Sequence, residues 1–220
     1  MDEFAHNLHS IGQIRLFKKG STILFQGEVP RRAFIVRDGV IRAYTINSSG
    51  EELIVSFFCK GDILPLPWLL DTTSNSLFYY DAVSDVRVLT VAKKDFLAYL
   101  MNSKKTLRTM LNFLNKQYAA LLLRITGLEQ ARAIEKIAFT LYYLMFRFGV
   151  EKSPGVFVVN IKLSQIMVAN LVGLTRESTT MNLGTLKDKG IIEYKRSTYI
   201  IHKKKLENFI GEDGFRDLII

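Results

Sequence analysis

Short apolar runs separated by turn residues fill the chain from Ile14 to Val91. The runs lie in the segments STILFQGE, RAFIVRDG, VIRAYTINSSG, ELIVSFFCKGD and YYDAVSDVRVLTV. Glycines at positions 20, 27, 39, 50 and 61 separate them, close to the spacing of about 8 to 12 residues that is typical of β-sandwiches and barrels. The pattern predicts a small β-roll or barrel.

The pattern becomes helical after this region. A short helix is expected near Lys93 to Met101, and the next segment, Ser103 to Leu128, contains no proline and no glycine before Gly127. Its apolar residues repeat at alternating intervals of four and three: Leu107, Leu111, Leu114, Tyr118, Leu121, Ile125 and Leu128. Because this is the a/d spacing of a coiled coil, the segment is predicted to pair with a second copy of itself. A core helix of a monomer is the alternative.

A further helix is expected from Gln130 to Phe148. The junction Gly127 to Glu129 is a candidate hinge, because glycine tolerates changes in backbone angles. The segment GVEKSPGVFVVNIK follows the helix, and its Pro-Gly pair predicts a hairpin.

Two short helices are predicted between Lys162 and Gly190. The first runs from Gln165 to Asn170 and ends before Gly173; Thr175 stands at the N-cap of the second, which runs to about Lys189. A glycine at the turn tolerates the backbone angles of a sharp reversal. This spacing predicts a helix-turn-helix.

A basic hairpin is predicted directly after the second helix. Its strands, Ile191 to Tyr194 and Thr198 to His202, flank the turn Lys195-Arg196-Ser197, and the exit is Lys203-Lys204-Lys205. Lysine and arginine at these places are suited to DNA phosphates. The alternative is an ordinary helical hairpin with lysines that serve solubility.

The charge is unevenly distributed. Of 30 basic and 21 acidic residues, positions 1–95 hold 11 of each, so the net charge of +9 lies wholly in positions 96–220, with 19 basic and 10 acidic residues. A basic half beside a neutral half indicates a nucleic-acid-binding module coupled to a module with another task.

Composition narrows the class of protein further. The chain has 220 residues, 48% of them hydrophobic, enough for two modest folded domains. No apolar run reaches the roughly 18 residues of a membrane span, and the first residues, MDEFAHNLHS, are unlike a secretory signal. A cytoplasmic protein without membrane contact is expected. The single cysteine, Cys59, excludes an intrachain disulfide; it is expected in a buried strand, with redox sensing as the alternative.

Several glycine-centred motifs carry a family resemblance. They are Lys19-Gly20, Gly27-Glu28, Phe34-Ile35-Val36, Gly39-Val40-Ile41-Arg42, Gly50 and Lys60-Gly61-Asp62. Together with the helix-turn-helix and wing, they resemble the cyclic-AMP receptor/fumarate-nitrate regulator (CRP/FNR) superfamily over nearly the whole chain, except Leu206 to Ile220. The resemblance implies an α+β fold with a jelly-roll-type β-roll sensor (1–102), a dimerisation helix and hinge (103–129) and a winged helix-turn-helix (130–220).

The chain departs from the cyclic-AMP-binding members of that family. Pro65-Leu66 stands about where a Gly-Glu pair is expected, and no arginine occurs between Arg42 and Arg87 to hold a phosphate. We therefore expect an effector other than cyclic AMP, without an identified cofactor. The residues expected to line its pocket are Leu64, Leu66, Trp68, Phe78, Tyr80 and Leu122. The alternatives are that these side chains merely fill the roll and that DNA binding needs no effector.

The resemblance places the start of the second helix in the major groove of DNA. The residues expected to contact DNA are Thr175, Arg176, Glu177, Ser178, Thr180, Asn182, Lys187, Lys195 and Arg196. Arginine suits guanine and glutamate suits cytosine. Met181 stands where many relatives have a second arginine, and Asn182 is expected either to face DNA or to be satisfied within the protein. The implied partners are a second copy, an inverted-repeat operator and, for an activator, RNA polymerase.

The sequence disfavours two rival classes of protein. An enzyme with a DNA-binding domain is disfavoured because no Ser/His/Asp arrangement, P-loop or metal-ligand cluster is recognisable. His6 and His9 form only a two-ligand pair. A nucleotide-binding subunit that acts on a protein partner is disfavoured by the missing glutamate and arginine.

Overall fold

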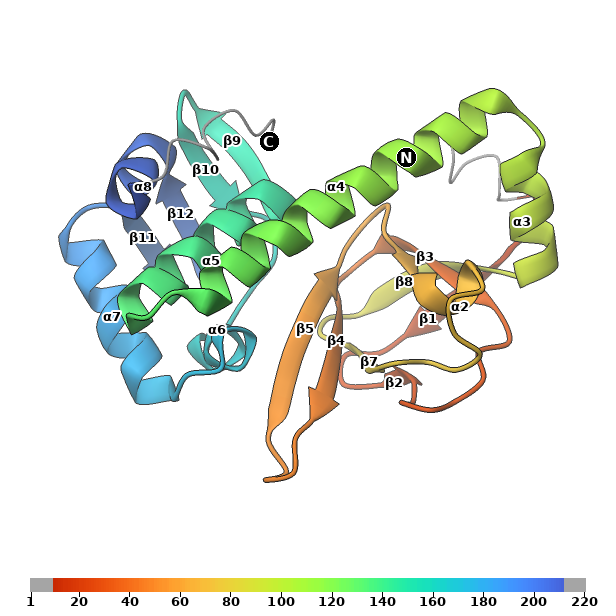
Figure 1. Cartoon of the computed structure of the whole chain (residues 1–220), viewed down its shortest axis with the longest axis horizontal. Coiled ribbons are helices and arrows are strands. Elements are labelled where there is room, and N and C mark those ends of the chain that lie inside the picture. Colours follow the sequence, from red (N-terminus) through yellow and green to blue (C-terminus); the bar gives the residue numbers. More distant parts are fainter. Residues whose placement is uncertain (1–9, 212–220) are drawn as a thin grey trace. The chain divides into compact units, whose positions relative to one another are not determined.

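The computed structural model describes residues 10–211, which form two compact units, 10–115 and 116–211. Figure 1 shows the strands of the first unit in red to yellow and the elements of the second in green to blue. None of the helices within the described range has the length and apolar composition to cross a membrane.

The first unit is a β-roll of two antiparallel four-stranded sheets. One sheet has the order β1 (Gln13–Phe17), β8 (Val86–Val91), β3 (Ala33–Asp38), β6 (Ile63–Leu64). The other has the order β2 (Thr22–Leu24), β7 (Tyr79–Ala82), β4 (Ile41–Ile46), β5 (Glu52–Phe58). The α+β fold with an N-terminal β-roll is therefore confirmed.

In the sheet β1-β8-β3-β6, strand β1 is exposed, whereas β3, β6 and most of β8 are buried. Along β3, Phe34 and Val36 join the cluster between the two sheets, whereas Ala33 and Ile35 join a cluster on the opposite face. This alternation follows from the two-residue period of a strand. The outer cluster is covered by α2 (Leu66–Leu69), α3 (Lys93–Met101) and the first part of α4 (Lys104–Glu129). The short helix expected at Lys93 to Met101 is confirmed.

Helix α4 confirms the long helix predicted from Ser103 to Leu128. Met110 and Phe113 are buried against the β-roll. Gly127 is helical, and a Cβ there would lie 2.8 Å from the Cβ of Phe139, so close packing is what requires a glycine at this position. The helix breaks only after Glu129, which moves the junction from the expected hinge at 127–129 to residues 130–132.

The second unit packs helices on a four-stranded sheet. The helices are α5 (Ala133–Phe148), α6 (Gln165–Val172), α7 (Arg176–Asp188) and α8 (Lys203–Ile210). The sheet has the order β11 (Ile192–Lys195), β12 (Thr198–His202), β10 (Val156–Val159), β9 (Gly149–Ser153) (Figure 1). The predicted hairpin is confirmed as β9-β10. Its pairing with the wing, where Phe157 faces Ile201, was not predicted.

The three lysines expected at the exit of the wing lie in helix α8. Lys203 to Lys205 begin this helix and do not extend the hairpin. The Lys205 Nζ donates to the Gly190 carbonyl at 3.1 Å, and the Lys203 Nζ lies 3.8 Å from Glu207. Two of these three lysines are thus engaged within the protein. The buried Glu207 also accepts a hydrogen bond from the Tyr142 hydroxyl at 3.1 Å, which fastens α8 to α5; residues 212–220 lie outside the described range.

Candidate DNA interface

The two helices α6 and α7 are capped as the sequence predicts. The Ser164 hydroxyl accepts from the Met167 N–H, and the Thr175 hydroxyl accepts from the Ser178 N–H, both at 3.2 Å. Gly173 ends α6 with a φ of 73° and a ψ of 38°, the left-handed conformation that glycine adopts without strain. The helix-turn-helix is confirmed, with α6 extending two residues beyond its predicted end.

Helix α7 has one buried face and one open face. Thr179, Leu183 and Leu186 are fully buried, and these positions recur at the helical period. Arg176, Glu177, Thr180 and Met181 are exposed. The predicted base-contacting residues Arg176 and Glu177 therefore lie on the open face of the second helix.

Three of the other predicted contacts use their polar atoms within the protein. Thr175 serves as the N-cap. The Thr180 hydroxyl donates to the Gln165 Oε1 at 2.8 Å and so joins the two helices. The Asn182 Nδ2 donates to the Ser178 carbonyl at 2.8 Å, which favours the satisfied polar residue of the two alternatives, while a DNA contact by Asn182 stays a prediction. Gln165 was missed because nothing in its local sequence indicates a contact with α7.

The wing is a tight hairpin with basic residues at its turn. Arg196 and Ser197 have φ values of 46° and 68°, which is typical of a two-residue type I′ turn. The Leu163 N–H donates to the Ser197 carbonyl at 2.9 Å and ties the turn to the segment before α6. The Lys187 Nζ lies 5.4 Å from the centre of the Tyr194 ring, so this lysine of α7 reaches the first wing strand.

A hollow of about 280 Å³ connects the wing to the helix-turn-helix. Its lining residues are Leu163, Ser164, Gln165, Ile166, Arg176, Tyr194, Arg196, Ser197 and Tyr199. The sequence did not place Arg176 and Arg196 together, yet both border this hollow. Two guanidinium groups beside one concave surface are suited to phosphate oxygens. All nine residues predicted to contact DNA remain predictions: Thr175, Arg176, Glu177, Ser178, Thr180, Asn182, Lys187, Lys195 and Arg196.

Tyr199, at the edge of this hollow, provides a test of stability at alkaline pH. Burial, with a smaller contribution from Tyr194, raises the pKa of Tyr199 to about 12, above the ordinary value of about 10. A raised pKa stabilises the fold below pH 10, and this contribution is lost as the pH rises from 10 to 12. The Tyr199→Phe protein should lack this decrease in the free energy of unfolding, which is roughly 1.4 kcal/mol per pH unit between pH 10 and 12. Urea unfolding of the original and the Tyr199→Phe protein at a series of pH values measures this difference. If the free energy of unfolding falls equally steeply with pH in both proteins, Tyr199 is not its source.

The residues expected to line an effector pocket are not brought together. Leu64, Phe78 and Tyr80 belong to the cluster between the sheets. Leu66 and Trp68 belong to the cluster on the other face of the sheet β1-β8-β3-β6. Leu122 lies in the second unit. The expectation that Leu64, Leu66, Trp68, Phe78 and Tyr80 line one pocket is therefore wrong. The sheet separates them into two hydrophobic clusters, one on each of its faces.

Arg42, the last arginine before the window in which the family arginine is missing, is also engaged within the protein. The two terminal nitrogens of Arg42 donate to the Glu52 carboxylate at 2.5 and 3.1 Å, and one of them also donates to Asp81 at 3.1 Å. The guanidinium carbon lies 4.3 Å from the centre of the Tyr44 ring. Arg42 therefore ties β4 to β5 and β7 and is occupied by two carboxylates, which disfavours a role as a phosphate ligand.

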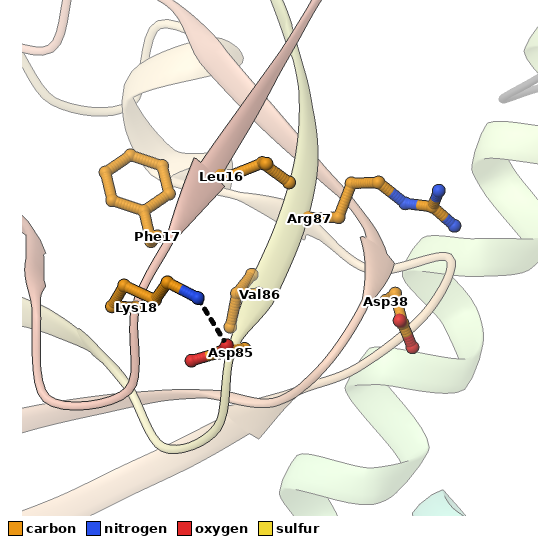
Figure 2. Close-up of a pocket in the computed structure, with 7 residues that line it drawn as sticks. All are labelled: Leu16, Phe17, Lys18, Asp38, Asp85, Val86 and Arg87. Carbon is orange, nitrogen blue, oxygen red and sulfur yellow. Dashed lines mark hydrogen bonds and ion pairs between the residues drawn. The ribbon is translucent and has the colours of Figure 1, made fainter.

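The β-roll has a separate surface hollow of about 280 Å³ (Figure 2). It is lined by Leu16, Phe17, Lys18, Asp38, Asp85, Val86 and Arg87. The exposed pair Lys18–Asp85, at 3.0 Å, lies beside it. None of the expected pocket residues borders this hollow. Within residues 10–211, no group of three or more His, Cys, Asp or Glu side chains is arranged to hold a metal ion; His6 and His9 lie outside that range.

Comparison with family models divides the chain in two. Residues 14–103 match the model of a cyclic nucleotide-binding domain, and residues 135–209 match that of a Crp-like helix-turn-helix domain. The first match covers the β-roll and the second covers the candidate DNA interface.

Curated proteins and solved structures resemble the chain over most of its length. It is 25% identical to the global nitrogen regulator of Synechococcus elongatus, over 90% of this chain and 86% of the relative. It is 24% identical to the anaerobic regulatory protein of Bacillus subtilis, over 90% and 83%. A CooA mutant from Carboxydothermus hydrogenoformans (19% identity, TM-score 0.75, 93% and 90% covered) and FixK2 from Bradyrhizobium japonicum (19%, 0.73, 90% and 96%) have the same fold.

Proposed function

Because this chain belongs to the CRP/FNR family of DNA-binding transcription regulators, we propose that it binds an inverted-repeat operator as a homodimer. One observation carries the proposal: a capped helix-turn-helix exposes Arg176 and Glu177 at the start of α7, beside a wing that carries Lys195 and Arg196. In a symmetric dimer, two such helices bind half-sites about one turn of DNA apart, roughly 34 Å.

Helix α4 supplies the proposed dimer contact. Seven residues of α4 were predicted at heptad spacing. Five of them are exposed apolar side chains in the single chain: Leu107, Leu111, Tyr118, Leu121 and Ile125. Leu114 packs in part against the β-roll, and Leu128 is half-buried. Because a continuous apolar stripe at heptad spacing is poorly suited to water, we assign it to pairing with α4 of a second copy.

The roles within the interface divide by chemistry. Arg176 is assigned to guanine O6 and N7, and Glu177 to cytosine N4. Lys187, Lys195 and Arg196 are assigned to phosphates, which supply affinity without sequence information. Thr175, Thr180 and Asn182 hold the reading face in place through their bonds within the protein, and Ser178 supplies the carbonyl that binds Asn182.

Arg176→Ala should weaken binding to the cognate operator by about 1 to 3 kcal/mol and leave binding to random DNA almost unchanged. The reason is that a bidentate contact to guanine discriminates between bases, whereas a phosphate contact does not. Fluorescence anisotropy with both DNAs measures the difference. Equal weakening on both would assign Arg176 to a phosphate instead.

The function itself is tested by binding of the ligand-free protein to DNA from its own upstream region. Scrambled DNA is the control, at about 150 mM salt, where nonspecific binding is suppressed. Selective binding supports an operator-binding regulator that is competent without a ligand. Weak binding that becomes selective after addition of a small molecule supports effector control. The absence of selectivity under every condition tested, including after selection from random DNA, would contradict the proposal.

We propose that the controlling signal is a small molecule other than cyclic AMP. The support is chemical: Pro65 and Leu66 replace the Gly-Glu pair at the start of α2, and Arg42 is occupied by Glu52 and Asp81. Titration with cyclic AMP should therefore leave operator affinity unchanged. The named relatives are regulators, so we also propose that this chain has no catalytic activity, acts in the cytoplasm where its DNA lies, and contacts RNA polymerase if it activates.

A further inference from the structure

Met181 occupies the centre of the open face of α7. Its side chain is 67% exposed, although it is apolar. The buried residues Leu183 and Leu186 lie on the opposite side of the helix, and Glu177 lies one turn earlier on the same open face. A long apolar side chain at the middle of a DNA-facing helix is therefore available to a partner and is not part of the core.

The surroundings of Met181 are adapted to a close apolar contact. The hydroxyl of Thr180 is bound to Gln165, and the amide of Asn182 is bound to the Ser178 carbonyl, so both neighbours direct polar groups to the protein. Gly184, three residues later on the same face, has no side chain, and a Cβ there would meet no protein atom within 4 Å. Nothing in the chain requires a glycine at this position of a helix. Its effect is to leave the surface beside Met181 open.

We propose that Met181 is a specificity-determining residue that contacts the C5 methyl group of a thymine in each half-site. The proposal rests on the proposed function. In the major groove the thymine methyl is the apolar group among the base edges, and the flexible, polarisable thioether of methionine adapts to such a contact. Arginine at the same place would instead favour guanine.

The geometry also restricts where that thymine lies. Glu177 and Met181 are four residues apart, which is about 6 Å along a helix, and successive base pairs are about 3.4 Å apart. The thymine should therefore lie within about two base pairs of the base that Glu177 contacts. Glu177→Ala locates that base, because it relaxes the preference at one position.

The experiment begins with selection of binding sites from random double-stranded DNA by the full-length protein. Each thymine of the selected half-site is then replaced by deoxyuridine, which lacks only the methyl group. At one thymine position, replacement in a single half-site should weaken binding about fourfold, as expected for the loss of one buried methyl-sized group. Replacement at that position in both half-sites should weaken it about fifteenfold. Met181→Ala should bind the thymine and deoxyuridine sites equally. Met101→Ala, at a methionine 76% exposed on α3, is the matched control and should keep the methyl dependence.

The outcomes separate this inference from the proposed function. If a site is selected but no thymine shows methyl dependence, or if the dependence persists in Met181→Ala, Met181 does not contact the methyl group and the regulator assignment stands. If no sequence is selected with or without an effector, the proposed function fails and this inference fails with it. Met181→Leu should retain the dependence, and unchanged thermal unfolding of both variants excludes loss of the fold.

Discussion

Replacing Leu111 by glutamate is expected to convert the protein from a dimer to a monomer and to weaken binding to a full operator by at least about a hundredfold. Leu111 is the second of the seven residues of the α4 stripe and is 57% exposed in the single chain, so the fold of each copy should tolerate the change. In a paired helix the same carboxylate would be buried without a partner, which strongly disfavours association. Loss of the second half-site contact then removes an avidity of about 10² to 10⁴.

Sedimentation gives the oligomeric state, and anisotropy with full and half operators gives the two affinities. Binding to an isolated half-site should change by less than about twofold, since dimerisation does not contribute to it. Asn112→Glu is the matched control: Asn112 is an exposed neighbour outside the heptad stripe, and it receives the same charge. A Leu111→Glu protein that remains dimeric would show that the α4 stripe is not the dimer contact.

The helix-turn-helix was predictable because its determinants are local. Ser164 binds an N–H three residues later, and Thr175 does the same. Gly173 needs only its own backbone angles to end α6. Signals of this range are visible in a sequence. The heptad stripe on α4 is likewise a local periodicity, and the structure confirms the helix while leaving its partner a prediction.

The effector pocket was not predictable from the same kind of signal. Ile63 and Leu64 are neighbours, yet they lie in two different cores on opposite faces of one sheet. An apolar run does not reveal which side of a strand each residue faces once both faces are buried. A segment rich in aromatic residues therefore predicts burial but not a common cavity.

Contacts between distant segments account for the other differences. The exit of the wing was expected to point toward DNA, but Lys205 binds the carbonyl of Gly190 at the end of α7. Thr180, a predicted DNA contact, donates its hydroxyl to Gln165, a bond that the sequence did not indicate. In each case a polar side chain found a partner that only the tertiary fold brings near. Lysine and threonine patterns alone do not distinguish a partner within the protein from one outside it.

Gly39→Ala is expected to destabilise the β-roll by about 2 to 5 kcal/mol. Gly39 connects β3 to β4 with a φ of +84°, and a Cβ there would lie 2.2 Å from the carbonyl oxygen of Asp85 and 2.9 Å from the Cα of Val86. The left-handed backbone alone costs a residue with a Cβ about 1 to 2 kcal/mol. The neighbouring atoms are backbone at the start of β8, so relief of the clash requires that two strands move apart, which adds a penalty of about 1 to 3 kcal/mol.

Gly20→Ala separates these two contributions. Gly20 has nearly the same φ, +85°, but a Cβ there would meet nothing within 4 Å, so it should cost only the backbone contribution of about 1 to 2 kcal/mol. Trp68 is the only tryptophan and is buried in the β-roll, so its fluorescence during urea unfolding reports on this unit alone. Equal losses for the two variants would mean that β8 moves away freely. A larger loss at Gly39 would show that the approach of β8 to this turn is a fixed part of the roll.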